Sequence, residues 1–534
     1  MLGGWLIFGF LVATAVLAVL SKRLGVAYPI VFVVAGSLLG FVPNLPAIQL
    51  DPDLIFLIVL PIFLFGAGWT TDWSDFKRNR RPIGLLAVGL VVFTTCVVAA
   101  LAHGVIPGMA WPAAFALGAI VAPTDSIAAE AIADGIAFPR RLLTIITGES
   151  LVNDAAALTI YQFAIAAAVT GTFVARTVVP QFVFVAIGGV MIGLIVGSAV
   201  QLMLEKLRAR DLVDEVLTNV ILLFAPFASY LPALALGVSG VLAAVTAGIY
   251  LSRQAPKLLT PDSRIIGYGI WEMLTYLLNA FVFLLLGLQL RGVVGVVGRA
   301  AIGPLLTWGI VISIAAIVLR FVWVFPATYL PRMLSRTLRE RDPYPPWQYP
   351  FIISWSGMRG IVSLTAALAL PVTVAGGAHF PRREETIFIT FCVIFATLVA
   401  MGLSLPLVVR ALGVLEDGKM EKKEIEIRIR ALEQGLQRLR ELEPTFDSEV
   451  EWEVEGRIVD EYQHRIEHLS GHLDGAANPQ AASEDSVDHR LQEEALNAER
   501  TAIQAMRTSG EIPDEIYRNI EFDLDLADAR LRAG

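Results

Sequence analysis

Two acidic side chains lie close together within one long apolar segment of this chain. Glu149 and Asp154 belong to the run TGESLVND at 147–154, which continues into AAALTIYQFAIAAAV. On insertion scales, a charged side chain at the centre of a membrane-crossing helix costs about 2.5–3.5 kcal/mol. Ionisable groups at that depth are rare and usually bind ions or relay protons. These two acids are therefore the first candidates for chemistry.

Helical geometry gives the two acids different surroundings. Glu149 and Asn153 are four residues apart and share a face, whereas Asp154 is rotated by about 100° from Asn153. A guanidinium keeps its charge and needs an anionic partner in an apolar environment. We therefore predict a structural ion pair between Glu149 and Arg359, which lies in another apolar segment. Asp154 is then left without a permanent cationic partner and must bind a cation or a proton.

Oxygen atoms around Asp154 could complete a site for a hard cation. Ser150 lies one helical turn before Asp154 and offers a hydroxyl, and Thr124 offers a hydroxyl or a backbone carbonyl. Asn153 could bridge through water or hold the chain near Thr124 in shape. Asp125 is either a second acid of the site or a helix cap. No resident metal or other cofactor is expected, and the bound species would be a cation or a proton.

The elements that must position these groups are membrane-crossing helices. A helix needs about 20 mostly apolar residues to cross the hydrocarbon core, and thirteen such runs can be placed. Two of them are interrupted, the fifth by Pro123-Thr124-Asp125 and the twelfth by Ser356-Gly-Met-Arg-Gly360. The runs lie near 3–20, 28–46, 53–71, 82–102, 110–133, 142–170, 178–204, 212–231, 234–252, 268–290, 302–328, 349–371 and 385–410.

The two interruptions predict where the site forms. Proline removes a backbone donor and glycine relaxes a helix, and irregular backbone at membrane depth must face protein or a wet cavity. The breaks are seven spans apart and so run in opposite directions, as in an inverted repeat of spans 1–6 against 8–13. We predict an all-α polytopic protein whose ion site lies between the discontinuous fifth and twelfth spans. Glu272 and Arg320 are expected near span ends, as anchors.

Charge fixes the predicted domains and orientation. Residues 1–413 carry 26 Lys and Arg against 19 Asp and Glu, whereas residues 414–534 carry 15 against 30. With the N-terminus outside, the connections on the cytoplasmic side hold 18 Lys and Arg, and the outward ones hold five. The positive-inside rule then places the acidic tail in the cytoplasm. We predict a transmembrane domain at 1–413 and a mostly helical, cytoplasmic regulatory tail at 414–534, whose partner is unknown.

Three histidines in the tail recur every four residues. His464, His468 and His472 would share one helix face, which fits either a pH or metal sensor or an ordinary solvated face. The solvated face is favoured, because no acidic or cysteine partner completes a ligand set. Both cysteines, Cys96 and Cys392, lie in apolar runs and form no metal motif or disulfide framework. Nothing in the sequence points to nucleic acid, and the expected environment is the lipid bilayer of the plasma (inner) membrane.

The three motifs together resemble one family. The runs GESLVND at 148–154, APTD at 122–125 and GMRG at 357–360 resemble the NhaP-like sodium/proton antiporters, relatives of the animal sodium/proton exchangers. The resemblance implies a homodimer with a core domain that moves as an elevator. It also implies that Asp154 carries the ion or proton, helped by Ser150 and a Thr124 backbone oxygen, while Glu149 pairs with Arg359.

The resemblance also bears on stoichiometry and selectivity. An Asn-Asp pair at 153–154, in place of two aspartates, is associated in this family with electroneutral one-for-one exchange. Relatives often carry an acid in span three, where this chain has Gly66. The expected function is antiport of Na⁺, or of K⁺ or Li⁺, against H⁺, with a K⁺/H⁺ antiporter of the same fold as the alternative. A cation channel or a membrane sensor is disfavoured, because no filter-like repeat is present and a sensor would not need matched broken helices. No enzymatic activity is expected.

Overall fold

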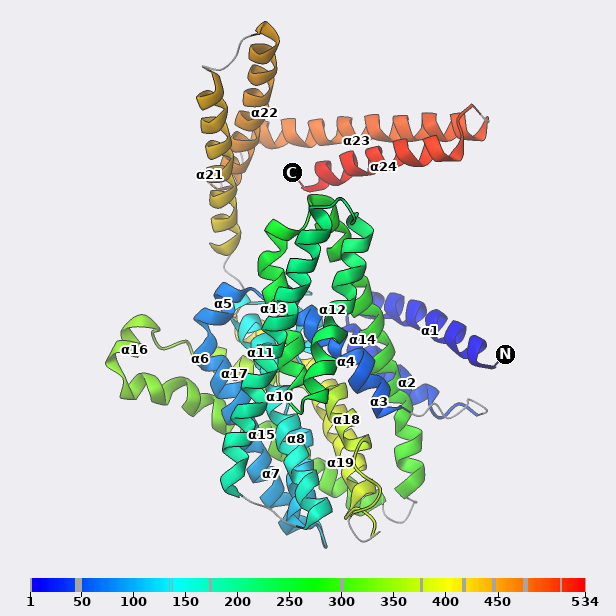
Figure 1. Ribbon diagram of the computed structural model, residues 1–534, viewed down its shortest axis with the longest axis vertical. Helices are drawn as coiled ribbons and strands as arrows, with labels where there is room; N and C mark the ends of the chain where they lie inside the picture. The colour runs from blue at the N-terminus through cyan, green and yellow to red at the C-terminus, as the bar shows by residue number, and fades with distance from the viewer. Residues whose placement is uncertain are drawn as a thin grey trace. The chain divides into compact units, whose positions relative to one another are not determined.

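Helices are the regular secondary structure of the computed structural model in the residues it describes, as the sequence predicts. These are residues 2–43, 50–133, 135–136, 138–171, 175–297, 302–374, 378–414, 419–443, 448–473, 479–509 and 511–533. Apart from helices, they contain one isolated β-bridge, between Thr373 and His379. The chain forms two compact units, Met1–Glu416 and Asp417–Gly534, shown with their helices in Figure 1.

The first unit contains long apolar helices interrupted by short π-helical turns (η). In chain order these are α1 (Leu2–Leu24), α2 (Tyr28–Leu39), α3 (Pro52–Leu54), η1 (Ile55–Val59), α4 (Leu60–Thr70), α5 (Trp73–Arg78), α6 (Arg80–Gly84), η2 (Leu85–Leu90), α7 (Val91–Val105), α8 (Trp111–Val121), α9 (Ile127–Ala133), α10 (Arg140–Thr170), α11 (Ala175–Arg208), α12 (Glu215–Ala235), α13 (Gly240–Leu258), α14 (Pro261–Val297), α15 (Ile302–Leu334), α16 (Arg336–Arg341), α17 (Gln348–Trp355), α18 (Ile361–Leu368), α19 (Arg383–Phe395), η4 (Ala396–Met401) and α20 (Gly402–Ala411).

Eight helical segments within the described residues are long and apolar enough to cross a membrane. They are Pro52–Thr70, Arg80–Val105, Arg140–Thr170, Val178–Arg208, Glu215–Ala235, Pro261–Gly295, Ile302–Leu334 and Arg383–Ala411. Two shorter apolar helices, Tyr28–Leu39 and Trp111–Val121, accompany them. Such a set of apolar helices is what a multi-pass membrane protein requires.

Two pairs of short helices are separated by non-helical backbone, at the positions where the sequence carries proline or glycine. The helix α8 ends at Val121 and α9 begins at Ile127, while α17 ends at Trp355 and α18 begins at Ile361. The backbone N–H of Asp125 donates to the carbonyl of Met358 over 2.8 Å. This hydrogen bond joins the two non-helical segments directly, and it satisfies a donor and an acceptor that have no helical partner.

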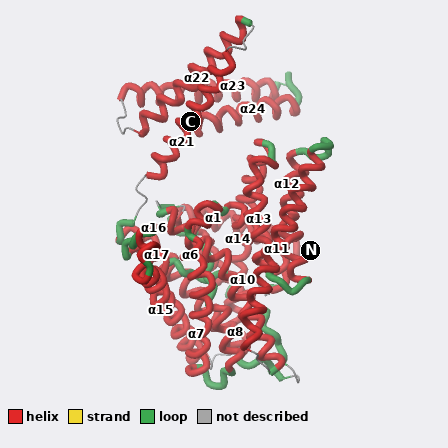
Figure 2. Tube along the Cα trace, turned by 60° about the vertical axis from the view of Figure 1, so that its left-hand side comes forward, coloured by secondary structure: helices red, strands yellow, loops and turns green. Residues whose placement is uncertain are grey.

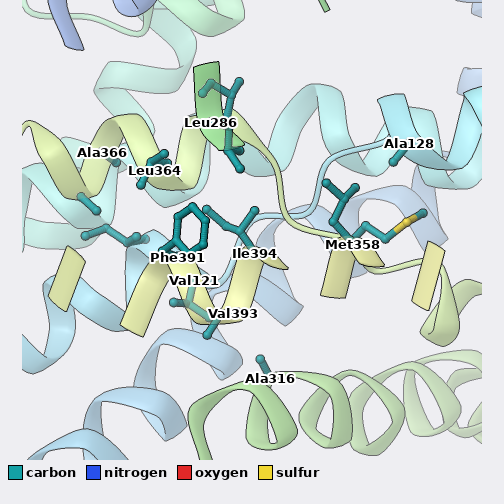
Figure 3. Close-up of a cluster of buried hydrophobic side chains, with 14 of the residues drawn as sticks. Val121, Ala128, Leu286, Ala316, Met358, Leu364, Ala366, Phe391, Val393 and Ile394 are labelled. Atoms are coloured by element: carbon teal, nitrogen blue, oxygen red, sulfur yellow. The ribbon is translucent and has the colours of Figure 1, made fainter. Parts of the chain in front are cut away.

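The core that holds these segments is apolar and tightly packed. Figure 3 shows Met358, from the second non-helical segment, within a cluster of buried side chains that includes Val121, Leu364 and Ile394. A second buried cluster involves α4, α12 and α13, with Phe65 and Leu251 fully enclosed. Side chains at these depths gain about 1.5–3 kcal/mol each from leaving water, so the irregular backbone is surrounded by rigid packing.

Close helix contact at one place depends on small residues. A Cβ atom added to Gly287 of α14 would clash with backbone atoms of α2, including the nitrogen of Ser37 at 2.7 Å. Conversely, one added to Gly36 of α2 would lie 3.1 Å from the Cα of Gly287. Glycines at such positions let membrane helices approach backbone to backbone, and this contact fixes α14, which forms one wall of the site described below.

The second unit consists of four charged helices, drawn as red tubes in Figure 2. They are α21 (Lys419–Leu442), α22 (Glu449–Leu473), α23 (Pro479–Thr508) and α24 (Asp514–Ala533). The ring of Tyr462 packs over Gly435 between α21 and α22, and Arg500 forms ion pairs with Asp525 and Asp528 between α23 and α24. His464 is exposed on α22, and the side chain of His472 lies outside the described residues.

Candidate ion-binding site

A cavity of about 600 Å³ lies inside the first unit and brings the polar residues of several elements together. Its walls come from α4, α9, α10 and α14, from residues 123–126 between α8 and α9, and from the beginning of α18. Four acidic residues line it, namely Asp125, Glu130, Asp154 and Glu272. Carboxylates gathered at a cavity wall attract cations, and the non-helical backbone supplies additional oxygen atoms.

Asp154 is a buried acid of this cavity, and the protein leaves its carboxylate open. Its residue surface is 9% exposed, and within the described residues its carboxylate makes no hydrogen bond or ion pair. Ser150, one turn earlier on α10, also lines the cavity. The Ser150 hydroxyl accepts a bond from the backbone N–H of Ser126 over 3.3 Å. Asp154 and Ser150 thus line the same wall of the cavity.

Asn153 holds the first non-helical segment in shape. Its Nδ2 atom donates to the carbonyl oxygen of Thr124 over 3.0 Å and to the Thr124 hydroxyl over 3.1 Å. The Thr124 hydroxyl in turn donates to Oε1 of Glu149 over 2.9 Å. Of the two roles that the sequence left open for Asn153, the structure shows the second, a direct contact with the break. A carbonyl oxygen has two lone pairs, so the Thr124 carbonyl still has one available.

Glu149 does form a buried ion pair, but the sequence prediction of its partner was wrong. Arg320 of α15 meets both carboxylate oxygens, Nη1 to Oε1 over 2.5 Å and Nη2 to Oε2 over 2.7 Å. The two side chains are 1% and 2% exposed. Two parallel bonds of this kind are the strongest geometry for a carboxylate and a guanidinium. Arg320 therefore occupies the place that the sequence assigned to Arg359.

The reason for the error is the length of α15. The hydropathy of the sequence ended the eleventh apolar run near residue 328, which placed Arg320 toward a span end. In the structure, α15 continues to Leu334, so Arg320 lies well inside the helix and is 1% exposed. Gly357 leaves room for it, because a Cβ atom there would lie 2.5 Å from Nε of Arg320. The single charge of Arg320 within an apolar run was the signal that could have identified it as the partner of Glu149.

Arg359 instead binds three backbone carbonyl oxygens, and two of them, those of Val121 and Gly357, lie at the breaks. Its Nε donates to Val121 over 3.2 Å, Nη1 to Gly357 over 2.5 Å, and Nη2 to Ala316 over 3.3 Å. Val121 is the last residue of α8, where carbonyl groups lack helical partners and the helix dipole is negative. A buried cation at this point satisfies both the hydrogen bonds and the dipole.

Asp125 caps a helix and also lines the cavity. Its Oδ1 atom accepts a hydrogen bond from the backbone N–H of Ile127 over 2.9 Å, at the beginning of α9. Its Oδ2 atom lies against Gly360, where an added Cβ atom would overlap it. Gly360 precedes the first residue of α18, so the carboxylate is near the positive ends of two short helices. The capping role that the sequence left open is therefore present, and exposure to the cavity accompanies it.

Sequence reasoning missed the contribution of α14 to the cavity. Glu272 lines the cavity beside Trp271 and Thr275, whereas the sequence placed it as an anchor. Glu130 also lines it and accepts a bond from the Thr147 hydroxyl over 3.1 Å. Gly66 faces the same wall, since a Cβ atom there would lie 3.5 Å from the Trp271 ring and 3.7 Å from the Thr275 hydroxyl. Glu272 was visible as an acid within an apolar run, as Asp154 was.

The fold and the cavity define the class of the protein as a multi-pass membrane transporter. The family model described as sodium/hydrogen exchanger, transmembrane, matches residues 10–411. The chain belongs to this sodium/hydrogen exchanger family, and the resemblance drawn from the three motifs is confirmed.

Relatives match over almost the whole chain. An uncharacterised Na⁺/H⁺ exchanger of Mycobacterium tuberculosis is 31% identical, covering 98% of this chain and 97% of that protein. The sodium, potassium, lithium and rubidium/H⁺ antiporter of Bacillus subtilis is 30% identical, covering 91% of this chain and 72% of that protein. The solved structure of the sodium proton antiporter MjNhaP1 from Methanocaldococcus jannaschii superposes with a TM-score of 0.58 at 17% identity, covering 76% of this chain and 97% of that one. The structural likeness shows the fold.

Proposed function

We propose that this chain is a secondary active antiporter that exchanges Na⁺ for H⁺ across the plasma membrane, with Asp154 binding the proton or the cation in turn. One observation carries the proposal. Among the described residues, Asp154 has a nearly buried carboxylate at the cavity wall with no partner from the protein, whereas Glu149 on the same helix is held by two bonds to Arg320. A carboxylate at this depth needs a counter-ion or a proton.

The cation would be bound by oxygen atoms of α10 and the first break. Asp154 supplies the charge, Ser150 a hydroxyl, and Thr124 its remaining carbonyl lone pair. Asn153 and Asp125 keep the break in place through the contacts with Thr124 and Ile127. One site that holds either a cation or a proton is the minimum that exchange requires. K⁺/H⁺ exchange is the second candidate, because the Bacillus subtilis relative is named for sodium, potassium, lithium and rubidium.

The proposed topology has thirteen spans with the N-terminus outside. In this arrangement α8 with α9 and α17 with α18 are two discontinuous crossing helices in an inverted repeat, joined where Asp125 meets Met358. The excess of Lys and Arg in the connections supports a cytoplasmic tail. The acidic tail would then regulate transport from the cytoplasm, and its separate compact fold supports that assignment.

A homodimer with a moving core domain completes the proposal. The helix α11 supports it, because only 22% of its most apolar stretch is buried within the chain. Large exposed side chains along it include Val183, Phe184, Ile187, Met191 and Ile195. A continuous apolar face of this kind suits either lipid or a second copy of the protein.

The test is exchange in proteoliposomes with Na⁺, K⁺ and Li⁺ compared. Asp154→Asn should abolish exchange while leaving a folded protein, because it removes the open charge of the site. The matched control is Asp211→Asn, which makes the same chemical change at an exposed residue outside the cavity, and should keep wild-type activity. Retained exchange in Asp154→Asn would refute the assignment.

An imposed membrane voltage tests the stoichiometry in the same vesicles. One-for-one exchange moves no net charge, so the initial rate of Na⁺-driven proton flux should be the same with and without voltage. A rate that follows the voltage would show that the Asn153–Asp154 pair does not produce electroneutral transport here.

A further inference from the structure

A second cavity of the first unit is lined by arginine rather than by acids. It measures about 40 Å³ and shares no lining residue with the cavity around Asp154. Arg81, Arg141 and Arg332 line it. They come from the beginning of α6, the first turn of α10 and the last turn of α15. We call this cavity the arginine pocket.

Helix ends are brought together here from distant parts of the chain. The residues Arg81, Arg141 and Arg332 are separated by 60 or more positions in sequence, yet all line one pocket. Each lies near the end of a segment that is long and apolar enough to cross a membrane. Such ends reach the level of the lipid headgroups, and by the charge distribution this is the cytoplasmic level.

The charges of the arginine pocket do not balance. Asp342 meets Arg141 over 2.9 Å with one carboxylate oxygen and Arg332 over 2.5 Å with the other. Both oxygens of Asp342 are thus engaged. The guanidinium of Arg81 has no hydrogen bond or ion pair within the described residues, although the residue is only partly exposed. Three guanidinium groups therefore face one carboxylate, and this excess of positive charge attracts a further anion.

The rest of the lining is mostly apolar. It includes Leu85, Leu142, Ile145, Val324 and Ile353. A single buried water needs about 10–15 Å³ of such space, so the pocket admits a group of the size of a phosphate. Arginine binds phosphate oxygens in a bidentate fork. Basic pockets between membrane helices at the cytoplasmic side suit anionic headgroups.

We propose that the arginine pocket binds the phosphate group of an anionic phospholipid, with Arg81 as the guanidinium that the protein leaves free for it. The mostly apolar lining favours a lipid over free phosphate, because an acyl chain or glycerol carbon can cover that surface and inorganic phosphate cannot. The site is independent of the antiport proposal, since none of its residues lines the Asp154 cavity.

Thermal unfolding of the purified full-length protein in detergent tests this. Phosphatidylglycerol should raise the unfolding midpoint of the wild type by a shift that grows with the lipid concentration, because a ligand that binds only the folded protein stabilises it by mass action. Phosphatidylcholine and inorganic phosphate at the same concentration should give much smaller shifts. Native mass spectrometry should show phosphatidylglycerol retained on the same samples.

A neighbouring arginine provides the matched control. Arg80 is exposed and does not line the pocket. Arg81→Gln should lose the shift and the retained lipid, Arg80→Gln should keep both, and Arg81→Lys should keep part of each. Equal shifts in Arg81→Gln and the wild type would overturn the proposal. Loss of the shift in both Gln variants would also overturn it, because that would indicate general attraction to the charged surface. An equal shift of the wild type with inorganic phosphate would overturn it as well, because that would exclude a lipid.

Discussion

Two acids on the same helix face opposite surroundings in this molecule. Glu149 is enclosed, meets Arg320 with both oxygens and accepts a third bond from the Thr124 hydroxyl. Asp154, little more than one turn further along α10, lines a cavity of about 600 Å³ and has no partner among the described residues. The comparison shows two ways to balance the charge of a buried carboxylate in this fold. The partner is either a fixed side chain of the protein or a bound ion or proton that can exchange.

The two solutions have different energetic consequences. Removing one member of a buried ion pair strands a charge and costs about 3–5 kcal/mol. Removing the charge of Asp154 strands nothing, because no cation from the protein depends on it in the described residues. Substitutions of Glu149 or its partner Arg320 should therefore mainly reduce the stability of the folded protein. Substitutions of Asp154 should mainly reduce transport.

The largest effect on stability is expected from Arg320→Gln. It leaves the Glu149 carboxylate buried without a charge partner, so the yield of folded protein and the unfolding midpoint should fall strongly. Adding Glu149→Gln should restore much of the loss, because a neutral amide no longer needs the guanidinium. Size-exclusion profiles and thermal unfolding of the single and double variants measure this.

Arg359 supplies the control for that double-variant experiment. Arg359→Gln should also destabilise the protein, since it removes the side-chain donor to the carbonyl oxygens of Val121 and Gly357 at the breaks, but Glu149→Gln should not rescue it. Rescue of Arg359→Gln and no rescue of Arg320→Gln would show that the functional ion pair is the one with Arg359.

An intermediate effect is expected at Gly66, on the Asp154 side. A Cβ atom there meets only ordinary contacts with Trp271 and Thr275, and Gly66 lines the open cavity, so Gly66→Glu should fold and place a further carboxylate there. The apparent KM for Na⁺ should fall by up to about tenfold, equivalent to about 1.4 kcal/mol. The isosteric control Gly66→Gln should leave KM near the wild-type value. An unchanged KM in Gly66→Glu would mean that this wall does not contact the ion.

The smallest effect is expected at Asp342, outside the membrane segments. Burial alone would raise its pKa, but the hydrogen bonds and charges of Arg141 and Arg332 hold that pKa below its ordinary value. A depressed pKa adds stability above the ordinary Asp value of about 3.9 and loses it as pH falls through the folded value. Asp342→Asn should therefore lower the unfolding midpoint slightly at pH 7, and the difference should vanish at acid pH. A constant difference across this range would exclude the ion pairs as its cause.

Much of the fold could be predicted from the sequence because the membrane imposes simple rules. Apolar runs identified the helices, and Pro123, Gly357 and Gly360 marked where α8 and α17 end. The separation of Glu149 from Asp154 followed from the 100° step between neighbouring positions of a helix. These inferences depend only on local periodicity and backbone chemistry.

The partners across helices could not be predicted in the same way. Choosing between Arg320 and Arg359 for Glu149 required the depth of each arginine, and α15 extends six residues beyond the predicted run. The wall that contains Glu272 and Thr275 depends on how α14 packs against α4, and Asn153 reaches Thr124 only through the tertiary arrangement of the break. Local periodicity carries no information on such contacts.

The central claim is that one carboxylate, Asp154, binds either the proton or the cation. The most direct measurement is the apparent KM for Na⁺ as a function of pH in proteoliposomes containing the wild type. If both ligands compete for this group, KM should rise about tenfold for each unit of falling pH on the acid side, while the rate at saturating Na⁺ stays nearly constant. A KM that does not change with pH, with only the maximal rate falling, would contradict the claim.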